Sequence, residues 1–251
     1  MNRFWGHTLS AAVLTVAAGT AIPACAHNDA SIFVHGVLLP PTPNGNACIY
    51  TADPTAALIN HGVVDGALTD NYSPEFLVGS TLIPKGNLAT PDSETARVEI
   101  QGTIIKVIDP VDNSVWENNS VLTAGILDPA SGTAPAYSAI QASIMDAAAV
   151  AHFTPPPPPT GQASTSKLAV VDVTFYGVTL GGQSVQSDVF EFPVDVCYGC
   201  LVSVPAGAVT GYCKGAVPST STALACQIGQ DQAVDCQKCY GNPLSTVCDS
   251  P

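Results

Sequence analysis

The sequence predicts an all-β protein: an antiparallel β-sandwich, immunoglobulin-like or related, with a disulfide-rich, irregular C-terminal region. Three observations predict this fold class. Short runs of alternating apolar and polar residues recur between turn residues, whereas runs with helical periodicity are scarce. Charged residues make up only 11% of the chain, as is typical of exported β proteins. Seven of the nine cysteines lie between residue 197 and the C-terminus.

The N-terminus has the layout of a secretory signal. Arg3 precedes an apolar run from about residue 9 to 22, which is shorter than the ~20 strongly apolar residues of a membrane span. Two cleavage sites remain open. The Ala24-Cys25-Ala26 motif fits ordinary signal peptidase and a signal of residues 1–26, whereas Ile22-Pro23-Ala24-Cys25 is a degenerate lipobox that would end the signal at residue 24 and place a lipid on Cys25. We favour the lipobox and expect an outer-membrane lipoprotein or a secreted protein.

The charge of the chain limits its partners. Removal of Arg3 with the signal leaves 6 basic residues against 20 acidic ones, a net charge of −14. So few Lys and Arg residues cannot neutralise a phosphate backbone, so we expect no nucleic-acid partner. A membrane is expected as a partner only through a lipid on Cys25, and a protein or glycan partner stays open.

The first half of the mature chain predicts six strands. They are expected within residues 31–40, 46–52, 62–72, 74–83, 95–110 and 114–129. In the fifth run the inward face changes phase near Gly102, which indicates a β-bulge. Its inward residues are expected to be Val98, Ile100, Thr103, Ile105 and Val107.

Residues 137–153 change from strand to helix. Ile140, Ala142 and Ile144 alternate with polar residues, so a strand is expected first. Asp146 can then cap a short helix over residues 147–153. The Pro-rich loop at 154–166 follows, and it is either a spacer between strands, which we favour, or a docking peptide for a Pro-binding domain.

The strand pattern is clearest over residues 167–197. Val171, Val173 and Phe175 alternate with polar side chains, and Gly181-Gly182 suits a tight turn. The return strand places Phe190, Phe192 and Val194 on one face. We therefore assign residues 27–196 to the β-sandwich and residues 197–251 to a Cys-rich region that packs on it and depends on cross-links.

Eight cysteines remain after signal removal, and in an oxidising compartment they predict four disulfides. They are Cys48, Cys197, Cys200, Cys213, Cys226, Cys236, Cys239 and Cys248. Seven of them lie in the C-terminal region, an odd number, so Cys48 must pair with one of these seven. That bond would attach the C-terminal region to the second predicted strand.

The two Cys-x-x-Cys pairs have other possible roles. Cys197 and Cys200, with Cys236 and Cys239, could supply four thiolates to zinc, but the spacing between the pairs exceeds that of a zinc ribbon. A catalytic redox pair would precede a helix, whereas the first pair lies between two strand-like runs. A structural cross-link is therefore the preferred interpretation of Cys197 and Cys200.

No catalytic motif is recognisable in the sequence. The histidines lack metal-ligand spacing, and Asp231 and Asp235 are expected to be solvated loop residues. We predict a non-enzymatic protein with a structural or binding role, without a cofactor or metal. The alternatives are a secreted hydrolase whose site assembles only in the fold, and an extracellular inhibitor or ligand-binding module.

Three segments carry a resemblance to a family. The segments CAHNDASIFVHGVLLP, GVVDGALTDNYSPEFLVGSTL and CQIGQDQAVDCQKC resemble an uncharacterised family of exported myxobacterial lipoproteins. The resemblance covers most of the mature chain and implies that Cys25 matches the lipid-bearing position, although Pro23 departs from the usual lipobox. It implies no activity.

Overall fold

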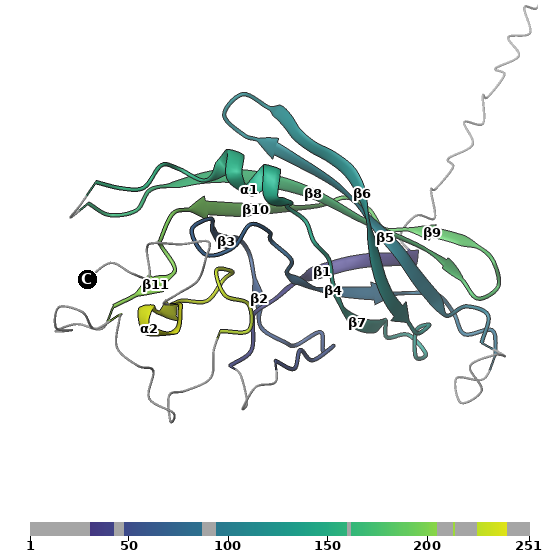
Figure 1. The fold of residues 1–251 in the computed structure, drawn as a ribbon. Coiled ribbons are helices and arrows are strands. Elements are labelled where there is room, and N and C mark those ends of the chain that lie inside the picture. Colours follow the sequence, from purple (N-terminus) through teal and green to yellow (C-terminus); the bar gives the residue numbers. More distant parts are fainter. Residues whose placement is uncertain are drawn as a thin grey trace, which may run out of the picture.

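The protein is all-β, and most of its strands lie in two sheets that share one hydrophobic core (Figure 1). The computed structural model describes residues 31–42, 48–86, 94–159, 162–204, 213 and 225–239. Among these residues, no helix has the length and apolar character that crossing a membrane requires.

The smaller sheet has four antiparallel strands in the order β2-β1-β4-β7. Their bounds are β1 Ile32–Leu38, β2 Leu58–Ile59, β4 Glu75–Ser80 and β7 Ala136–Gln141. The strands predicted within residues 31–40 and 74–83 are therefore present, each shorter than its sequence run. The strand expected in the first half of residues 137–153 is also present, but it ends at Gln141, before Ala142 and Ile144.

The larger sheet has six strands, in the order β3-β10-β8-β5-β6 with β9 beside β8. Their bounds are β3 Gly62–Asp65, β5 Val98–Asp109, β6 Ser114–Leu127, β8 Ser166–Thr179, β9 Ser184–Gln186 and β10 Phe190–Cys197. One pairing departs from the predicted antiparallel arrangement, because β3 runs parallel to β10. Parallel pairing places Asp65 opposite Cys197, at the C-terminal ends of both strands.

The core is built from the inward faces of both sheets. Phe76 of β4 meets Phe175 of β8 edge to face, with ring centroids 5.3 Å apart, and Tyr72 stacks on Phe192. The five residues predicted to face inward on β5 are all buried. The bulge near Gly102 is also confirmed, since the register of β5 shifts between Ile100 and Gly102 against both neighbouring strands.

The second predicted strand, at residues 46–52, is wrong. Residues 48–52 have no strand structure, and the side chain of Ile49 is 71% exposed. The alternating pattern of residues 46–52 predicted a strand, but a strand also needs a neighbour to pair with, and a local pattern does not supply one. The edge position beside β1 is instead taken by β2, whose Leu58 pairs with Leu38.

The short helix α1, Ala147–Phe153, begins as predicted at Asp146. The Asp146 carboxylate accepts the Ala149 N–H at 2.8 Å, and Val150 and Phe153 are buried. After α1, the described part of the Pro-rich loop leads to β8 and so connects two elements of the fold. Pro155 at its start is buried.

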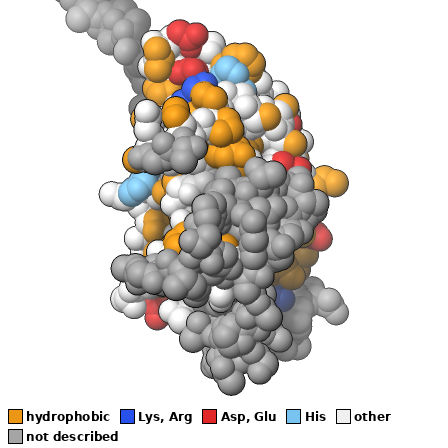
Figure 2. Space-filling view, turned by 60° about the vertical axis from the view of Figure 1, so that its left-hand side comes forward, with side chains coloured by type: hydrophobic (Ala, Val, Ile, Leu, Met, Phe, Trp, Pro, Cys, Tyr) orange, Lys and Arg blue, Asp and Glu red, His pale blue; other side chains and the backbone are white. Residues whose placement is uncertain are grey.

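The described C-terminal residues contain little regular structure. They comprise β11 Val202–Ser203, β12 Val234–Asp235 and the one-turn helix α2 Cys236–Cys239, with β11 and β12 forming a two-stranded parallel sheet. A second, small core of Leu68, Val234 and two cysteines supports this region. Figure 2 views the molecule from this side, and hydrophobic, acidic, basic and histidine side chains are intermixed on the described surface at the top of the view.

Candidate functional site

Three disulfides cross-link the described residues. They join Cys48 to Cys226, Cys197 to Cys200, and Cys213 to Cys236, with Cα–Cα separations of 5.6, 5.9 and 5.1 Å. The first is the bond from Cys48 to the C-terminal region that the odd number of cysteines required. By the chain-entropy model, loops of these lengths correspond to stabilisation of roughly 5, 2 and 3.5 kcal/mol respectively.

Three predicted cysteine positions fall outside these bonds. Cys25 and Cys248 lie outside the described residues, as does the side chain of Cys239. Cys197, Cys200 and Cys236 are all oxidised, so three of the four cysteines in the zinc alternative do not present thiolates.

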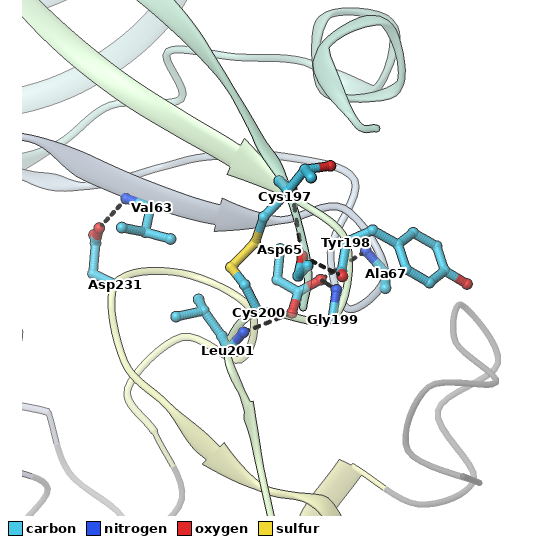
Figure 3. Close-up of a disulfide and its surroundings, with 11 residues drawn as sticks. Val63, Asp65, Ala67, Cys197, Tyr198, Gly199, Cys200, Leu201 and Asp231 are labelled. Atoms are coloured by element: carbon cyan, nitrogen blue, oxygen red, sulfur yellow. Dashed lines mark hydrogen bonds between the residues drawn. A yellow bond between two sulfur atoms is a disulfide. The ribbon is translucent and has the colours of Figure 1, made fainter. Parts of the chain in front are cut away.

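The Cys197–Cys200 disulfide closes a tight turn at the end of β10 (Figure 3). Gly199 has φ +75°, a conformation that glycine adopts without steric cost. The Cys197 side chain is 1% exposed, whereas Cys200 is exposed. The ring of Tyr198, between the two cysteines, points away from the disulfide.

A buried carboxylate organises this turn. Asp65, fully buried at the end of β3, accepts the N–H of Gly199 at 2.6 Å and that of Leu201 at 2.9 Å. It also accepts the N–H of Ala67 at 3.0 Å. These three bonds compensate for burial of the charge and tie β3 to the turn after β10.

Asp65, Cys197 and Cys200 bring potential metal ligands within 4.8 Å of one another. The two sulfurs are bonded to each other, and the carboxylate oxygens already accept three N–H groups. The cluster is therefore assigned to the cross-linked turn.

A second carboxylate, which is half-buried, holds the C-terminal region on the sheets. Asp231 accepts the Val63 N–H at 2.8 Å and the Tyr72 hydroxyl at 2.9 Å. Its own N–H donates to the Val63 carbonyl at 2.9 Å, and its φ of +55° is unusual for a residue other than glycine. The expectation that Asp231 is solvated is wrong, because its carboxylate packs beside β3 and accepts hydrogen bonds from Val63 and Tyr72.

Burial raises the pKa of Asp231 to about 6. The hydrogen bonds from Val63 and Tyr72, and the nearby His61, act in the opposite direction but do not cancel this desolvation. Burial also raises the pKa of the neighbouring Glu75 and, with help from the charge of Glu75, that of Tyr50. The gap between these three groups does not admit a water molecule, whereas on their other side Tyr50 and Glu75 line an open hollow of about 530 Å³ beside the Cys48–Cys226 disulfide.

A large, open hollow formed by described residues has a volume of about 1420 Å³. It runs over β5, β6, β8 and β9, and most of its polar side chains are neutral. We define this groove by Gln101, Ile104, Ser120, Tyr176, Gln183 and Gln186, with Lys85 and the segment 81–83 along one side. The Tyr176 and Ser120 hydroxyls are 2.9 Å apart and form a hydrogen bond between β8 and β6.

The described histidines lie apart from one another. His35 contacts the Tyr137 ring, His61 lies beside Asn60, and His152 stacks on Trp116 with ring centroids 3.3 Å apart.

Sequence reasoning missed Asp65 and placed Asp231 in solvent. Asp65 lies in the run VVDGA, where an acid before glycine indicates a local turn. The partners of its carboxylate beyond that turn, Gly199 and Leu201, are 134 and 136 residues away. No local pattern could have revealed them.

Comparisons with protein-family models and with curated proteins found no match to this chain. The resemblance to exported myxobacterial lipoproteins stays a prediction.

Proposed function

We propose that this chain is an exported, non-enzymatic binding protein of the cell envelope, either anchored by a lipid on Cys25 or secreted. Disulfides between distant segments support an oxidising compartment, because such bonds persist outside the reducing cytosol. The secretory layout of the first residues supports the same location.

The groove is the observation that carries the binding role. Its amide and hydroxyl side chains offer both donors and acceptors, and Ile104 and Tyr176 supply apolar surface between them. This chemistry suits a neutral ligand rich in hydroxyl groups, such as a glycan chain. A charged ligand would meet only Lys85 along the lining.

The hydrolase alternative would be favoured by a deep pocket lined by a histidine and two acids. The groove lining contains neither a histidine nor an acid. Asp231 lies near His61, but the gap that it lines does not admit a water molecule, and neither residue lines the open hollow beside Glu75. The described geometry therefore gives more support to binding.

Cosedimentation with insoluble neutral polysaccharides, cellulose and chitin, tests the binding role. We expect the protein to bind at least one of them, and the double variant Gln101→Ala, Ile104→Ala to weaken that binding about tenfold. Val111→Ala is the matched control, since Val111 is 90% exposed at the tip of the β5–β6 hairpin and outside the groove. Absence of binding to both polysaccharides, or equal loss in the control, would overturn the proposal.

A further inference from the structure

Among the three disulfides of the described residues, Cys197–Cys200 closes the shortest loop. Its cysteines are 3 residues apart, against 178 and 23 for the others. Closing so short a loop removes the least entropy from the unfolded chain, so this bond contributes least to holding the fold. It can open without releasing the C-terminal region, because the Cys48–Cys226 disulfide still joins that region to the N-terminal part of the chain and Cys213–Cys236 cross-links it internally.

The two sulfurs of this disulfide differ in accessibility. Cys200 is exposed, whereas Cys197 is buried under the turn. Thiol–disulfide exchange begins when a thiolate attacks an accessible sulfur, and the other sulfur leaves. The geometry therefore makes Cys200 the attacked sulfur and Cys197 the leaving group.

The turn is held independently of the sulfur–sulfur bond. Asp65 binds the Gly199 and Leu201 N–H groups, and the Gly66 N–H donates to the Cys197 carbonyl at 2.9 Å. These bonds keep both cysteine backbones in place after the disulfide opens. The two thiols then remain close enough to form the disulfide again.

A small hollow lies beside this turn. It has a volume of about 320 Å³, and Tyr198 and Gly66 line it together with Val150, Pro155 and Pro157 of α1 and the Pro-rich loop. The lining is largely apolar, and Tyr198 lies between the two cysteines in the chain. A peptide segment that carries a thiol could dock in this hollow, on the Tyr198 side of the turn that Cys197 and Cys200 close.

We propose that the Cys197–Cys200 disulfide is a thiol–disulfide exchange site that oxidises an external thiol. A thiolate attacks Cys200, a mixed disulfide forms, and Cys197 leaves as a thiolate that takes a proton from solvent. A second thiolate then attacks the mixed disulfide at the sulfur of the first thiol, and the bond to Cys200 breaks, so that Cys200 leaves as a thiolate that takes a proton from solvent. The two external thiols become one disulfide, and the two electrons reside in the Cys197 and Cys200 thiols. This activity goes beyond the proposed binding role and does not depend on it.

The first experiment equilibrates the full mature protein with graded mixtures of reduced and oxidised dithiothreitol. Rapid alkylation and peptide mapping then report each cysteine pair. We expect Cys197 and Cys200 to convert reversibly to the dithiol while the Cys48–Cys226 and Cys213–Cys236 disulfides and the near-ultraviolet circular dichroism are unchanged. The proposal is overturned if this pair opens only together with another disulfide or with loss of the fold.

The second experiment tests which sulfur reacts and with what. Cys197→Ser leaves the exposed Cys200 thiol, and Cys200→Ser leaves the buried Cys197 thiol. With oxidised glutathione, and separately with a cysteine peptide activated as a mixed disulfide, we expect Cys197→Ser to form adducts at least tenfold faster than Cys200→Ser. Faster reaction with the peptide than with glutathione would assign the hollow to a peptide thiol, and equal rates would assign the site to small thiols. Equal reactivity of the two variants would contradict the assigned attack on Cys200. If either variant fails to fold, the dithiothreitol titration of the unaltered protein still decides the matter.

Asp65 is a positioning residue in this proposal. Asp65→Ala should slow re-formation of the disulfide from the dithiol, because the Gly199 and Leu201 N–H groups lose their acceptor. Asp65→Asn retains one acceptor oxygen and should partly restore the rate. An unchanged rate in Asp65→Ala would remove this role.

Discussion

The Tyr72 hydroxyl donates to the Asp231 carboxylate, with oxygen–oxygen distances of 3.1 and 2.9 Å across 159 residues of chain. Tyr72 lies in the core between the sheets, and Asp231 belongs to the C-terminal region. This contact and the Cys48–Cys226 disulfide therefore attach the same region to the sheets by independent means.

Asp231→Asn should reduce the pH dependence of stability. The pKa of Asp231 is raised from 3.8 to about 6, so the folded state binds the proton more tightly than the unfolded state. This carboxyl therefore stabilises the fold most below about pH 4, and the contribution is lost as pH rises through 6. The loss is on the order of 2–3 kcal/mol. Urea unfolding at pH 4 and pH 7.5 measures it.

The difference between the unaltered protein and Asp231→Asn isolates this group, because Glu75 and Glu117 also have raised pKa values and change stability in the same direction. Asparagine retains an acceptor for Val63 and Tyr72 but carries no charge. The same pH dependence in both proteins would show that Asp231 is not buried in solution.

Cys48→Ser should free the thiol of Cys226 and make the C-terminal region sensitive to protease. The loop closed by this bond is the longest of the three, so the free energy of unfolding should fall by up to about 5 kcal/mol. Limited proteolysis with thiol counting checks both results. Cys226→Ser removes the same disulfide, so it should make the C-terminal region equally sensitive to protease. A C-terminal region that resists protease in both variants would contradict the prediction that the Cys48–Cys226 disulfide protects it.

Asp65→Ala should destabilise the fold by about 2–4 kcal/mol, because three buried N–H groups lose a charged acceptor. Asp70→Ala, on the same loop but exposed, is the matched control and should change stability by less than about 0.5 kcal/mol. Chemical denaturation compares them. Equal effects would show that burial of Asp65 does not matter to stability.

Gly177→Ala tests the close approach of β8 to β5. A Cβ at residue 177 would overlap the Glu99 carbonyl, a backbone group that cannot rotate away, so a loss of more than about 2 kcal/mol is expected. In Gly102→Ala the new Cβ meets the Tyr176 ring, a side chain that can move. Thermal unfolding should therefore show the larger loss for Gly177→Ala, and the reverse order would contradict the register of these strands.

The parts of the fold that the sequence predicted are those with local causes. The inward face of β5, its bulge at Gly102 and the cap of α1 at Asp146 each depend on a few neighbouring residues. Partners distant in the chain were not predictable in this way. The parallel pairing of β3 with β10 and the contacts of Asp65 and Asp231 depend on tertiary packing, which no local pattern encodes.

One distant contact could be predicted, because seven cysteines in the C-terminal region cannot all pair with one another, whatever their distance along the chain. This count required a bond from Cys48 to the C-terminal region, which the structure contains as Cys48–Cys226. The same counting could not choose among the seven cysteines, since connectivity depends on geometry.

The central claim, an exported protein whose C-terminal region is held by disulfides, is tested most directly by intact mass. The protein is taken from membrane and medium fractions and measured after denaturation without reduction. We predict a chain that begins at Cys25 with a lipid, or after Ala26 without one, and that lacks eight hydrogens for four disulfides. A chain that retains residues 1–24, or one with all its cysteines as free thiols, would contradict the account.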